Sequence, residues 1–394
     1  MNDDPHAAQV RPDYQGAGIA NLIQSIAQAC GANPVPDLPP LSTPQPALDQ
    51  NDHLVLLVVD GLGDEHLKGT DRAPCLQKQY GGRLTSVFPS TTASAIPTFL
   101  TGVPPQQHGL TGWHMYFSEI DRVIATLPLY RRGRGPLGTA PAQLPAKLFI
   151  HAPVFDRIHR HAYVVSPRKI VESPFNQYHS GRAKRIGYEG VDELFAALET
   201  VIKQAKGQSY TYAYFSEIDA LAHDHGIASE QVAQRLGELD QAFGEFLERI
   251  EGSNATVVVT ADHGFIDSPP ERHIDLADHP QLTDTLARPL CGERRVAYCY
   301  VKPHQRRSFK DYIADELQPY LTVHSSADLI DAGWYGTGTP HPRLRERVGD
   351  YCLIMKDNWI VHDHVPGERP HDQLGVHGGT SPAEMYVPLL IARA

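Results

Sequence analysis

Carboxylate and imidazole side chains recur in four short segments of the chain, each next to a run of apolar residues. The segments read "VVDG", "DALAH", "ADHG" and "VHGG", and they place aspartate and histidine at close spacing. Mixed oxygen and nitrogen ligands suit zinc or manganese better than calcium, which prefers oxygen ligands. The segments predict a metal site whose candidate ligands are Asp60, Asp219, His223, Asp262, His263 and His377.

The number and spacing of these side chains indicate how many ions they would hold. Asp219 and His223 are four residues apart, so one helical turn would point both at a common centre. Six ligands exceed what one tetrahedral zinc ion needs, which favours two ions. Taken singly, the segments have structural alternatives: Asp60 could cap a turn, and Asp219 with His223 could form a solvated helix face.

A cluster of hydroxyls in "SVFPSTTASAIPTFLTG" offers a nucleophile. Ser90, Thr91 and Thr92 fall where an extended segment is expected to enter a short helix. A hydroxyl at a helix N-terminus that touches a divalent cation ionises more easily than one in water. Ser and Thr at such places are also common N-caps. The residue types alone leave all three hydroxyls as candidates.

The elements that must position these groups are buried strands alternating with helices. Continuous apolar runs at 53–60, 209–215 and 254–262 are typical of strands buried on both faces. Apolar stripes at helical spacing predict helices over 191–206 and 229–251. This alternation indicates an α/β fold with a mostly parallel sheet sandwiched by helices. Ligands collect at the carboxyl ends of such strands, where the predicted metal ligands fall.

The chain divides into three predicted parts. Residues 1–50 read as a lead-in and proline-rich linker, in which 19–29 is a short amphipathic piece. Residues 51–270 together with 372–394 form the predicted catalytic core. Residues 271–371 form a predicted inserted subdomain of α+β type, with a strand in 294–302, a helix near 308–321 and a glycine- and proline-rich loop around 334–342.

Composition narrows the classes of function. A net charge of −11 argues against binding to a nucleic-acid polymer or an anionic membrane, although a bound cation can still attract an anionic substrate. The five scattered cysteines favour neither a disulfide framework nor a thiolate zinc site. The segment "MNDDPHAAQVRPDY" lacks the apolar core of a signal peptide, so a cytoplasmic location is expected. The sequence carries no signal of oligomeric state.

The ordered set of Asp60, "FPSTT", "DALAH", "ADHG" and "VHGG" resembles the alkaline phosphatase superfamily, and within it the type I phosphodiesterase/nucleotide pyrophosphatase branch. The resemblance covers about 50–270 and 372–394. It implies a hydrolase of phosphodiesters or nucleotide-like phosphoesters with two divalent cations, usually zinc, and a phospho-threonine intermediate. It implies Thr92 as nucleophile and metal ligand, Asp60, Asp262 and His263 around one ion, and Asp219, His223 and His377 around the other.

One departure from the family pattern concerns the phosphate. The branch commonly has Asn three residues after the nucleophile, in contact with a phosphoryl oxygen, and this chain has Ala95 there. A phosphomonoesterase or phosphonate hydrolase on the same site is therefore an alternative. A metal-stabilised binding protein without catalysis is a second, which Ala95 favours and the intact ligand set opposes.

Two groups of residues are candidates for substrate contacts. Arg168 and Lys169 begin a basic loop that could hold an extra phosphate oxygen, and a solvated loop is the simpler interpretation. Trp113, followed by Tyr116 and Phe117, could stack a base or an aryl leaving group, and packing is the simpler interpretation there.

Overall fold

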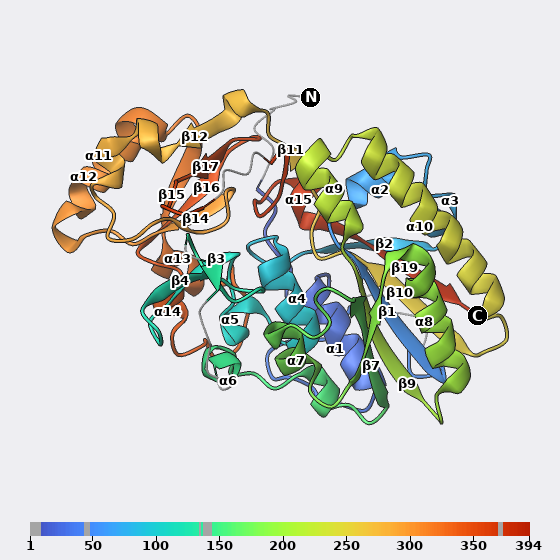
Figure 1. Ribbon diagram of the computed structural model, residues 1–394. Coiled ribbons are helices and arrows are strands. Elements are labelled where there is room, and N and C mark those ends of the chain that lie inside the picture. Colours follow the sequence, from blue (N-terminus) through green and yellow to red (C-terminus); the bar gives the residue numbers. More distant parts are fainter. Residues whose placement is uncertain (1–8, 43–47, 134, 137–143, 369–372) are drawn as a thin grey trace.

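A seven-stranded sheet forms the larger lobe of the computed structural model, which describes residues 9–42, 48–133, 135–136, 144–368 and 373–394 (Figure 1). The strand order is β2 (Tyr80–Thr85), β19 (Tyr386–Arg393), β10 (Ala255–Thr260), β1 (His53–Val59), β9 (Ser209–Phe215), β7 (His161–Pro167) and β8 (Lys184–Tyr188).

The centre of this sheet is parallel because helices connect its strands. β1 pairs in parallel with both β10 and β9, while β19 pairs antiparallel with β10 and β2. Every residue of β10 is buried, and so is every residue of β1 after His53, which explains their continuous apolar sequences. The predicted α/β fold class with a mostly parallel sheet is confirmed.

Helices cover both faces of the first sheet. On one side α10 (Glu230–Arg249) packs against α8 (Gly190–Gln204), α9 (Glu217–His225) and α3 (Pro74–Lys78). On the other side α4 (Thr92–Thr101) packs against α1 (Ile19–Ala29) and α7 (Pro174–Ser180), as Figure 1 shows. The predicted helices at 191–206 and 229–251 are confirmed with ends shifted by one or two residues. Shorter helices are α2 (Asp64–Gly69), α5 (Pro105–His108), α6 (Leu144–Leu148) and α15 (Pro382–Met385).

Helix α1 belongs to the main core, although its sequence neighbourhood was expected to be a lead-in. Ile19, Ile23 and Ile26 are fully buried in the same hydrophobic cluster as the central strands. The buried Gln24 donates a hydrogen bond to the carbonyl of Gly102 at 2.7 Å, just past the end of α4. Helix α1 is therefore held against α4 by both apolar packing and a hydrogen bond. Residues 43–47 of the expected linker lie outside the described residues.

A second sheet of eight antiparallel strands forms the smaller lobe, at the left of Figure 1. It joins chain segments 114–136 and 291–355, so strands from the part expected to be catalytic core lie in the same sheet as the predicted insertion. The strand order is β15 (Leu321–Ser325), β16 (Tyr351–Met355), β14 (Val296–Cys299), β13 (Cys291–Gly292), β3 (His114–Phe117), β4 (Arg122–Ala125), β5 (Tyr130–Arg131) and β6 (Gly135–Pro136).

Short helices and two small strand pairs complete this lobe and its junction with the larger one. The pair β12 (His273–Asp275) and β17 (Ile360–His362) is parallel, and the pair β11 (Ile266–Asp267) and β18 (Gly375–Val376) is antiparallel. The helices are α11 (Pro280–Thr283), α12 (Arg306–Tyr312) with a π-helical continuation at Ile313–Leu317, α13 (Ser326–Asp331) and α14 (Leu344–Arg347).

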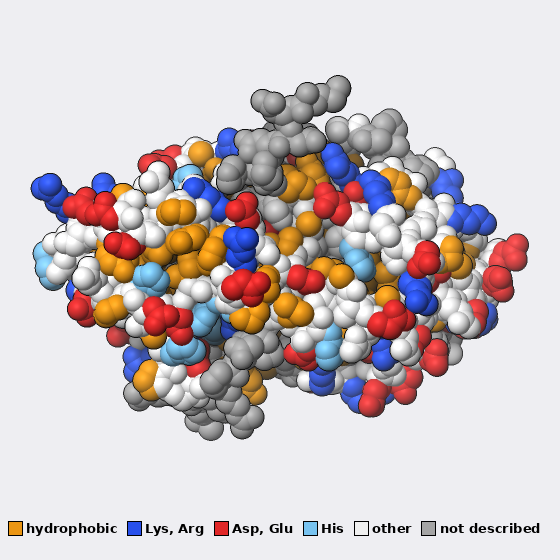
Figure 2. All heavy atoms as spheres, turned by 90° about the horizontal axis from the view of Figure 1, so that it is seen from above, with side chains coloured by type: hydrophobic (Ala, Val, Ile, Leu, Met, Phe, Trp, Pro, Cys, Tyr) orange, Lys and Arg blue, Asp and Glu red, His pale blue; other side chains and the backbone are white. Residues whose placement is uncertain are grey.

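The surface carries both signs of charge. Figure 2 shows acidic and basic side chains interspersed over the face seen from above, without one continuous field of either sign. Within the described parts of the chain, every helix is too short or too polar to cross a lipid bilayer.

Candidate functional site

The predicted metal ligands meet at the carboxyl ends of the central strands. Asp60 follows β1, and Asp262 and His263 follow β10. Helix α9 begins just after β9 and carries Asp219 and His223 one turn apart. His377 directly follows β18. Because adjacent parallel strands end at the same edge of the sheet, residues far apart in the chain converge there.

The first group of ligands surrounds the Thr92 hydroxyl. Thr92 Oγ1 lies 3.0 Å from His263 Nε2 and 3.4 Å from Asp60 Oδ1. His263 Nε2 lies 3.3 Å from Asp60 Oδ1 and 3.5 Å from Asp262 Oδ2. All four side chains are buried or nearly so. A hydroxyl, two carboxylates and one imidazole therefore face a common point.

The second group lies beside the first. His223 Nε2 is 3.4 Å from Asp219 Oδ1, and His377 Nε2 is 3.8 Å from the same oxygen. The rings of His377 and His263 stack with centroids 3.7 Å apart, which joins the two groups. Asp219 also lies with Asp60 and His263 such that one ligand atom from each falls within 4.8 Å of the others. The candidate ligands therefore form two adjacent groups, and Asp219 belongs to both.

Backbone and side-chain hydrogen bonds orient these ligands. His223 Nδ1 bonds the Gly375 carbonyl at 2.9 Å, and His263 Nδ1 bonds the Gly264 carbonyl at 3.0 Å. Each bond fixes its ring and leaves Nε2 free to coordinate. The Tyr214 hydroxyl, on β9, donates to Asp60 Oδ2. Supporting contacts of this kind are what a preorganised metal site requires.

The buried carboxylates of the site place negative charges close together, which a cation would stabilise. Burial raises the pKa of Asp60 well above its ordinary value, and the charges of Asp219 and Asp262 raise it further. Removal from water likewise raises the pKa of Asp219. Among the described residues, the buried oxygens Asp219 Oδ1 and Asp262 Oδ2 have no hydrogen-bond partner. Unsatisfied buried carboxylates cost free energy unless a cation binds them, so these residues fit divalent metal ions.

Geometry separates the three candidate hydroxyls. The Ser90 hydroxyl donates to the Gly379 carbonyl at 2.7 Å, and the Thr91 hydroxyl donates to Glu293 Oε1 at 2.7 Å. Thr92, the first residue of α4, is the one of the three whose hydroxyl contacts Asp60 and His263. Among the three, Thr92 Oγ1 is thus the hydroxyl that lies beside the clustered carboxylate and imidazole groups.

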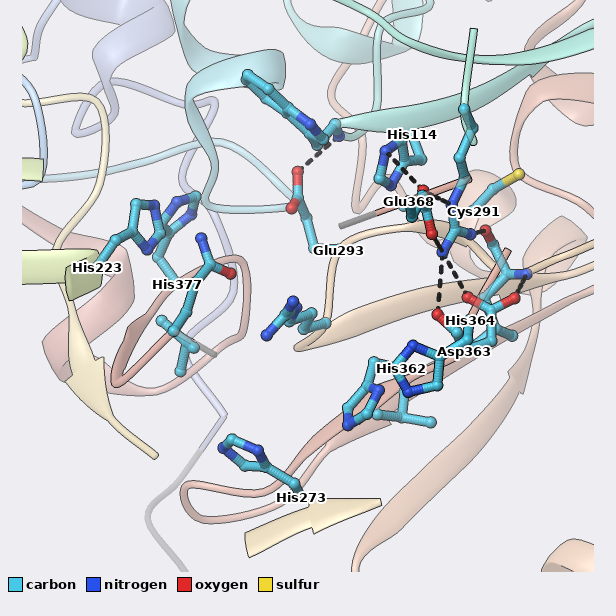
Figure 3. Close-up of a pocket in the computed structure, with 18 of the residues that line it drawn as sticks. His114, His223, His273, Cys291, Glu293, His362, Asp363, His364, Glu368 and His377 are labelled. Carbon is cyan, nitrogen blue, oxygen red and sulfur yellow. Dashed lines mark hydrogen bonds and ion pairs between the residues drawn. The ribbon is translucent and has the colours of Figure 1, made fainter. Parts of the chain in front are cut away.

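A cavity of about 490 Å³ opens from this centre toward the smaller lobe. Figure 3 shows His223 and His377 on one side of it, and His114, Asp363 and Glu368 on the other. Because the cavity is lined from both lobes, the smaller lobe contributes to whatever binds there. Its lining includes Thr92, Trp113, Arg132, Glu293, His362 and His364.

The residues predicted to contact the substrate lie in different places in the structure. Trp113 lines the cavity and is 39% exposed. Arg168 and Lys169 are exposed, and neither of them lines the cavity. Arg168 instead pairs with Glu193 of α8 at 2.8 Å. The solvated-loop interpretation describes these two residues, and we do not retain them as substrate contacts.

The sequence did not indicate several other polar residues of the cavity. Glu293 accepts hydrogen bonds from Thr91 Oγ1 and the Trp113 amide, and burial raises its pKa to about 7. Arg132 bonds Asp363 and Glu368, each at 2.7 Å. These residues lie in irregular segments that carry no motif. An H-x-H spacing in "WIVHDHV" was the available signal for His362 and His364.

Ala95 occupies the position, three residues after Thr92, where the family commonly has asparagine. Ala95 is fully buried inside α4, and its amide bonds the Thr91 carbonyl at 2.9 Å. Its methyl group offers no hydrogen bond to a phosphoryl oxygen. Any contact that replaces the asparagine must come from another group at the end of the cavity near Thr92.

Comparison with solved structures shows that the fold is shared. Murine ectonucleotide pyrophosphatase/phosphodiesterase 5 matches with a TM-score of 0.66 and 16% identity, over 85% of this chain and 87% of the other. Phosphonoacetate hydrolase from Sinorhizobium meliloti 1021 matches with a TM-score of 0.61 and 16% identity, over 87% of this chain and 90% of the other.

Sequence comparison shows the family. The mouse protein ectonucleotide pyrophosphatase/phosphodiesterase family member 3 is 22% identical over 251 residues, which is 61% of this chain and 27% of the mouse protein. The chain therefore spans about a quarter of the length of this curated relative. The family model described as type I phosphodiesterase/nucleotide pyrophosphatase matches residues 54–380. Because this match covers well over half of the chain, the chain belongs to the type I phosphodiesterase/nucleotide pyrophosphatase family.

Proposed function

We propose that the protein is a metal-dependent phosphodiesterase or nucleotide pyrophosphatase that acts on a small phosphoester through a phospho-threonine intermediate. The observation that carries this proposal is the position of Thr92 Oγ1, 3.0 Å from His263 Nε2 and 3.4 Å from Asp60 Oδ1. A nucleophile in hydrogen-bond reach of its activating groups is the signature of covalent catalysis. Membership of the family supports the reaction class.

Two divalent cations, zinc or manganese, are part of the proposal. Asp60, Asp262 and His263 would hold one beside Thr92. The other would be held by Asp219, His223 and His377. When bound, such a pair stabilises negative charge on the attacking and leaving oxygens of an in-line displacement.

The residues of the chain account for the bond changes. Thr92 Oγ1 attacks phosphorus, the bond from Oγ1 to phosphorus forms, and the bond from phosphorus to the leaving oxygen breaks. The hydroxyl proton moves to Asp60 Oδ1, which already accepts from it, and passes from there to solvent. The leaving oxygen departs as an anion and takes up a proton from water. A water molecule then attacks the phosphorus of phospho-threonine, which breaks the bond to Oγ1 and restores the hydroxyl. Stacking on Trp113 would hold an aromatic leaving group.

The N-terminus of α4 offers a replacement for the missing asparagine. The first hydrogen bonds within this helix are those of the Ser94 and Ala95 amides to the Thr91 carbonyl. The amides of Thr92 and Ala93 come before these and have no carbonyl of the helix to bond. Amides at the start of a helix bind phosphate oxygens, so they would orient the phosphoryl group at Thr92.

Charge in the cavity favours diesters over monoesters. A monoester carries one more negative charge at the reacting phosphorus and needs a further cation to hold the extra oxygen. Arg132, a strong cation of the lining, is engaged by two acids, Asp363 and Glu368. An inactive variant of murine ectonucleotide pyrophosphatase/phosphodiesterase 5 has been solved in complex with AMP, which supports a nucleotide-like ligand.

A small panel of substrates tests the substrate class. We expect the metal-loaded protein to show a higher kcat/KM for bis-p-nitrophenyl phosphate than for p-nitrophenyl phosphate or phosphonoacetate. A clear preference for the monoester or the phosphonate would replace the diesterase by the corresponding alternative. No turnover of any of the three, with zinc or manganese bound, would identify a catalytically silent binding protein.

Thr92→Ala tests the nucleophile in the same assay. We expect it to bind metal like the wild type and to lose turnover by several orders of magnitude, because its side chain cannot form the covalent intermediate. Thr92→Ser keeps the hydroxyl and should retain measurable turnover. Acid quench during turnover, followed by mass spectrometry, should find a phosphoryl group on the Thr92 peptide of the wild type. Near wild-type rates in Thr92→Ala would refute the assignment.

The cytoplasmic location expected from the sequence stays a prediction, which cell fractionation would test.

A further inference from the structure

A second cluster of metal-type ligands lies in the smaller lobe, apart from the residues assigned above. Asp275, His362 and His364 each offer one ligand atom, and these atoms lie within 4.8 Å of one another. The first residue ends β12, the second ends β17 and the third follows two positions later. None of the three has a part in the proposed reaction.

Strand pairing brings the cluster together. β12 and β17 pair in parallel, and their register sets Asp275 opposite His362. His364 follows just after the end of β17, and its ring lies beside that of His362. The cluster is therefore fixed by the backbone pairing and not by a chance meeting of long side chains.

The carboxylate of Asp275 is held in one orientation. Its Oδ1 accepts a hydrogen bond from the Ala277 amide at 2.9 Å. Its Oδ2 is turned toward His364 Nε2, 3.0 Å away. One oxygen is thus used to position the group, and the other faces the imidazoles, as in many carboxylate ligands of metals.

A simple ion pair between Asp275 and His364 is the alternative interpretation, and it leaves part of the cluster unexplained. The ring of His362 lies beside that of His364, with centroids 5.2 Å apart and planes 77° apart. Two imidazoles within 4.8 Å of one carboxylate group exceed what a single ion pair uses. They match a site with two nitrogen ligands and one oxygen ligand.

The cluster borders the same cavity as the catalytic residues. His362 and His364 line it, together with His223 and His377. Figure 3 shows the two pairs of histidines on different sides of the cavity. A cation bound at the cluster would therefore face a ligand that is seated at Thr92.

We propose that Asp275, His362 and His364 bind a third divalent cation, of the zinc or manganese type. Two nitrogens and one oxygen suit these ions better than magnesium or calcium. Three protein ligands leave coordination positions open, and at this place they open toward the cavity. The cation would anchor a second anionic group of the substrate, remote from the scissile phosphorus. This last role rests on the proposed function, whereas the binding of the cation does not.

Metal counting tests the site directly. The full chain is stripped with a chelator and dialysed against zinc or cobalt(II), and the bound metal is measured per chain. We expect His362→Ala/His364→Ala to hold one equivalent less than the wild type and to lose the corresponding part of the cobalt visible spectrum. Asp275→Asn keeps the acceptor for the Ala277 amide and should weaken the same equivalent. His304→Ala, which removes an exposed imidazole of the same lobe, should bind as the wild type does.

The outcomes separate this site from the catalytic one. His223→Ala/His377→Ala should lose metal from the catalytic centre and keep the equivalent that depends on His362 and His364. If His362→Ala/His364→Ala binds as much metal as the wild type, and its circular dichroism spectrum is unchanged, the third site does not exist. Thr92→Ala decides the catalytic proposal, and its result does not alter this count.

Discussion

At the scale of single residues, Glu293 links the two lobes at the reacting end of the cavity. Its Oε1 accepts hydrogen bonds from Thr91 Oγ1 at 2.7 Å and from the Trp113 amide at 2.6 Å. Burial raises its pKa from about 4.5 to about 7, and the negative charge of Asp219 adds to the effect. In the folded protein this carboxyl group therefore keeps its proton at pH values where an unfolded chain has lost it.

The raised pKa of Glu293 should make the free energy of unfolding depend on pH. Below pH 4.5 the group is protonated in both states, and between pH 4.5 and 7 only the folded state holds the proton. Folding stability from Glu293 is thus lost as pH rises through this window, by at most about 3 kcal/mol. Glu293→Gln keeps the acceptor oxygen without the titration.

The measurement compares thermal unfolding of metal-free Glu293→Gln and wild-type protein. The variant should gain stability relative to the wild type as pH is raised from 5 to 8. Glu271→Gln, at an exposed position, should show no such trend. A constant difference between Glu293→Gln and wild type across this range would show that Glu293 has an ordinary pKa.

At the scale of elements, the turn after β10 is the tightest part of the site. A Cβ at Gly264 would lie 2.0 Å from the Ala383 carbonyl oxygen and 2.9 Å from Gly63 Cα. The Gly264 amide also donates to the Glu384 carbonyl at 2.8 Å. Three backbone segments thus meet at one point, directly after Asp262 and His263, so the turn cannot shift without moving those ligands.

Gly264→Ala should therefore disturb both stability and metal binding. The added methyl group overlaps a backbone atom, and relief of the clash must displace the turn at a cost of about 2–4 kcal/mol. We expect a lower melting temperature and weaker zinc binding by competition with a chelator. Gly69→Ala is the control, because no atom lies within 4 Å of its added Cβ. Equal behaviour of the two variants would contradict the role given to the turn.

The same elements show how far the sequence predicts the structure. β1, β9 and β10 were predictable because buried parallel strands are continuously apolar, and five of the six candidate metal ligands followed from where those strands end. The sixth, His377, was predicted from its place just before the final apolar strand. The strands β3 to β6 were missed because they are only two to four residues long. The range of α1 was predicted, but its burial depends on contacts with α4 that the periodicity of a single helix does not specify.

Some side chains of the site could likewise be predicted from the sequence, and others could not. The choice of Thr92 over Ser90 and Thr91 required the family resemblance, since all three hydroxyls suit a helix start. Glu293 could not be predicted, because it reaches Thr91 from 202 positions further along the chain. Residues brought in by tertiary contacts between lobes leave no local pattern in the sequence.

At the scale of the whole molecule, a buried ion pair connects the two sheets. Arg295, between β13 and β14, forms two parallel hydrogen bonds to Glu384 of α15, with Nε–Oε1 at 3.1 Å and Nη2–Oε2 at 3.0 Å. Their side chains are 1% and 0% exposed. Glu384 also accepts from the Gly379 amide at 2.7 Å, close to His377. The junction of the lobes and the candidate metal ligand His377 therefore share one support.

Removal of one partner should be costly. Arg295→Met leaves Glu384 as a buried carboxylate without its counter-charge, which costs about 3–5 kcal/mol in comparable cases. Arg345→Met breaks an exposed pair with Asp331, at 3.0 Å, and should change the free energy of unfolding by less than about 1 kcal/mol. Denaturant unfolding of both variants checks this. A small loss for Arg295→Met would show that the lobes are held together elsewhere.

The place of β19 has a consequence for biosynthesis. This strand lies between β2 and β10, so it fills the interior of the first sheet although it comes after both in the chain. A ribosome releases β2 and β10 long before residues 386–393, and until then each of these strands exposes an unpaired backbone edge. Until β19 has been synthesised, the edges of β2 and β10 that it will pair with are open to pairing with strands of other chains. We expect the nascent protein to be prone to aggregation during this interval.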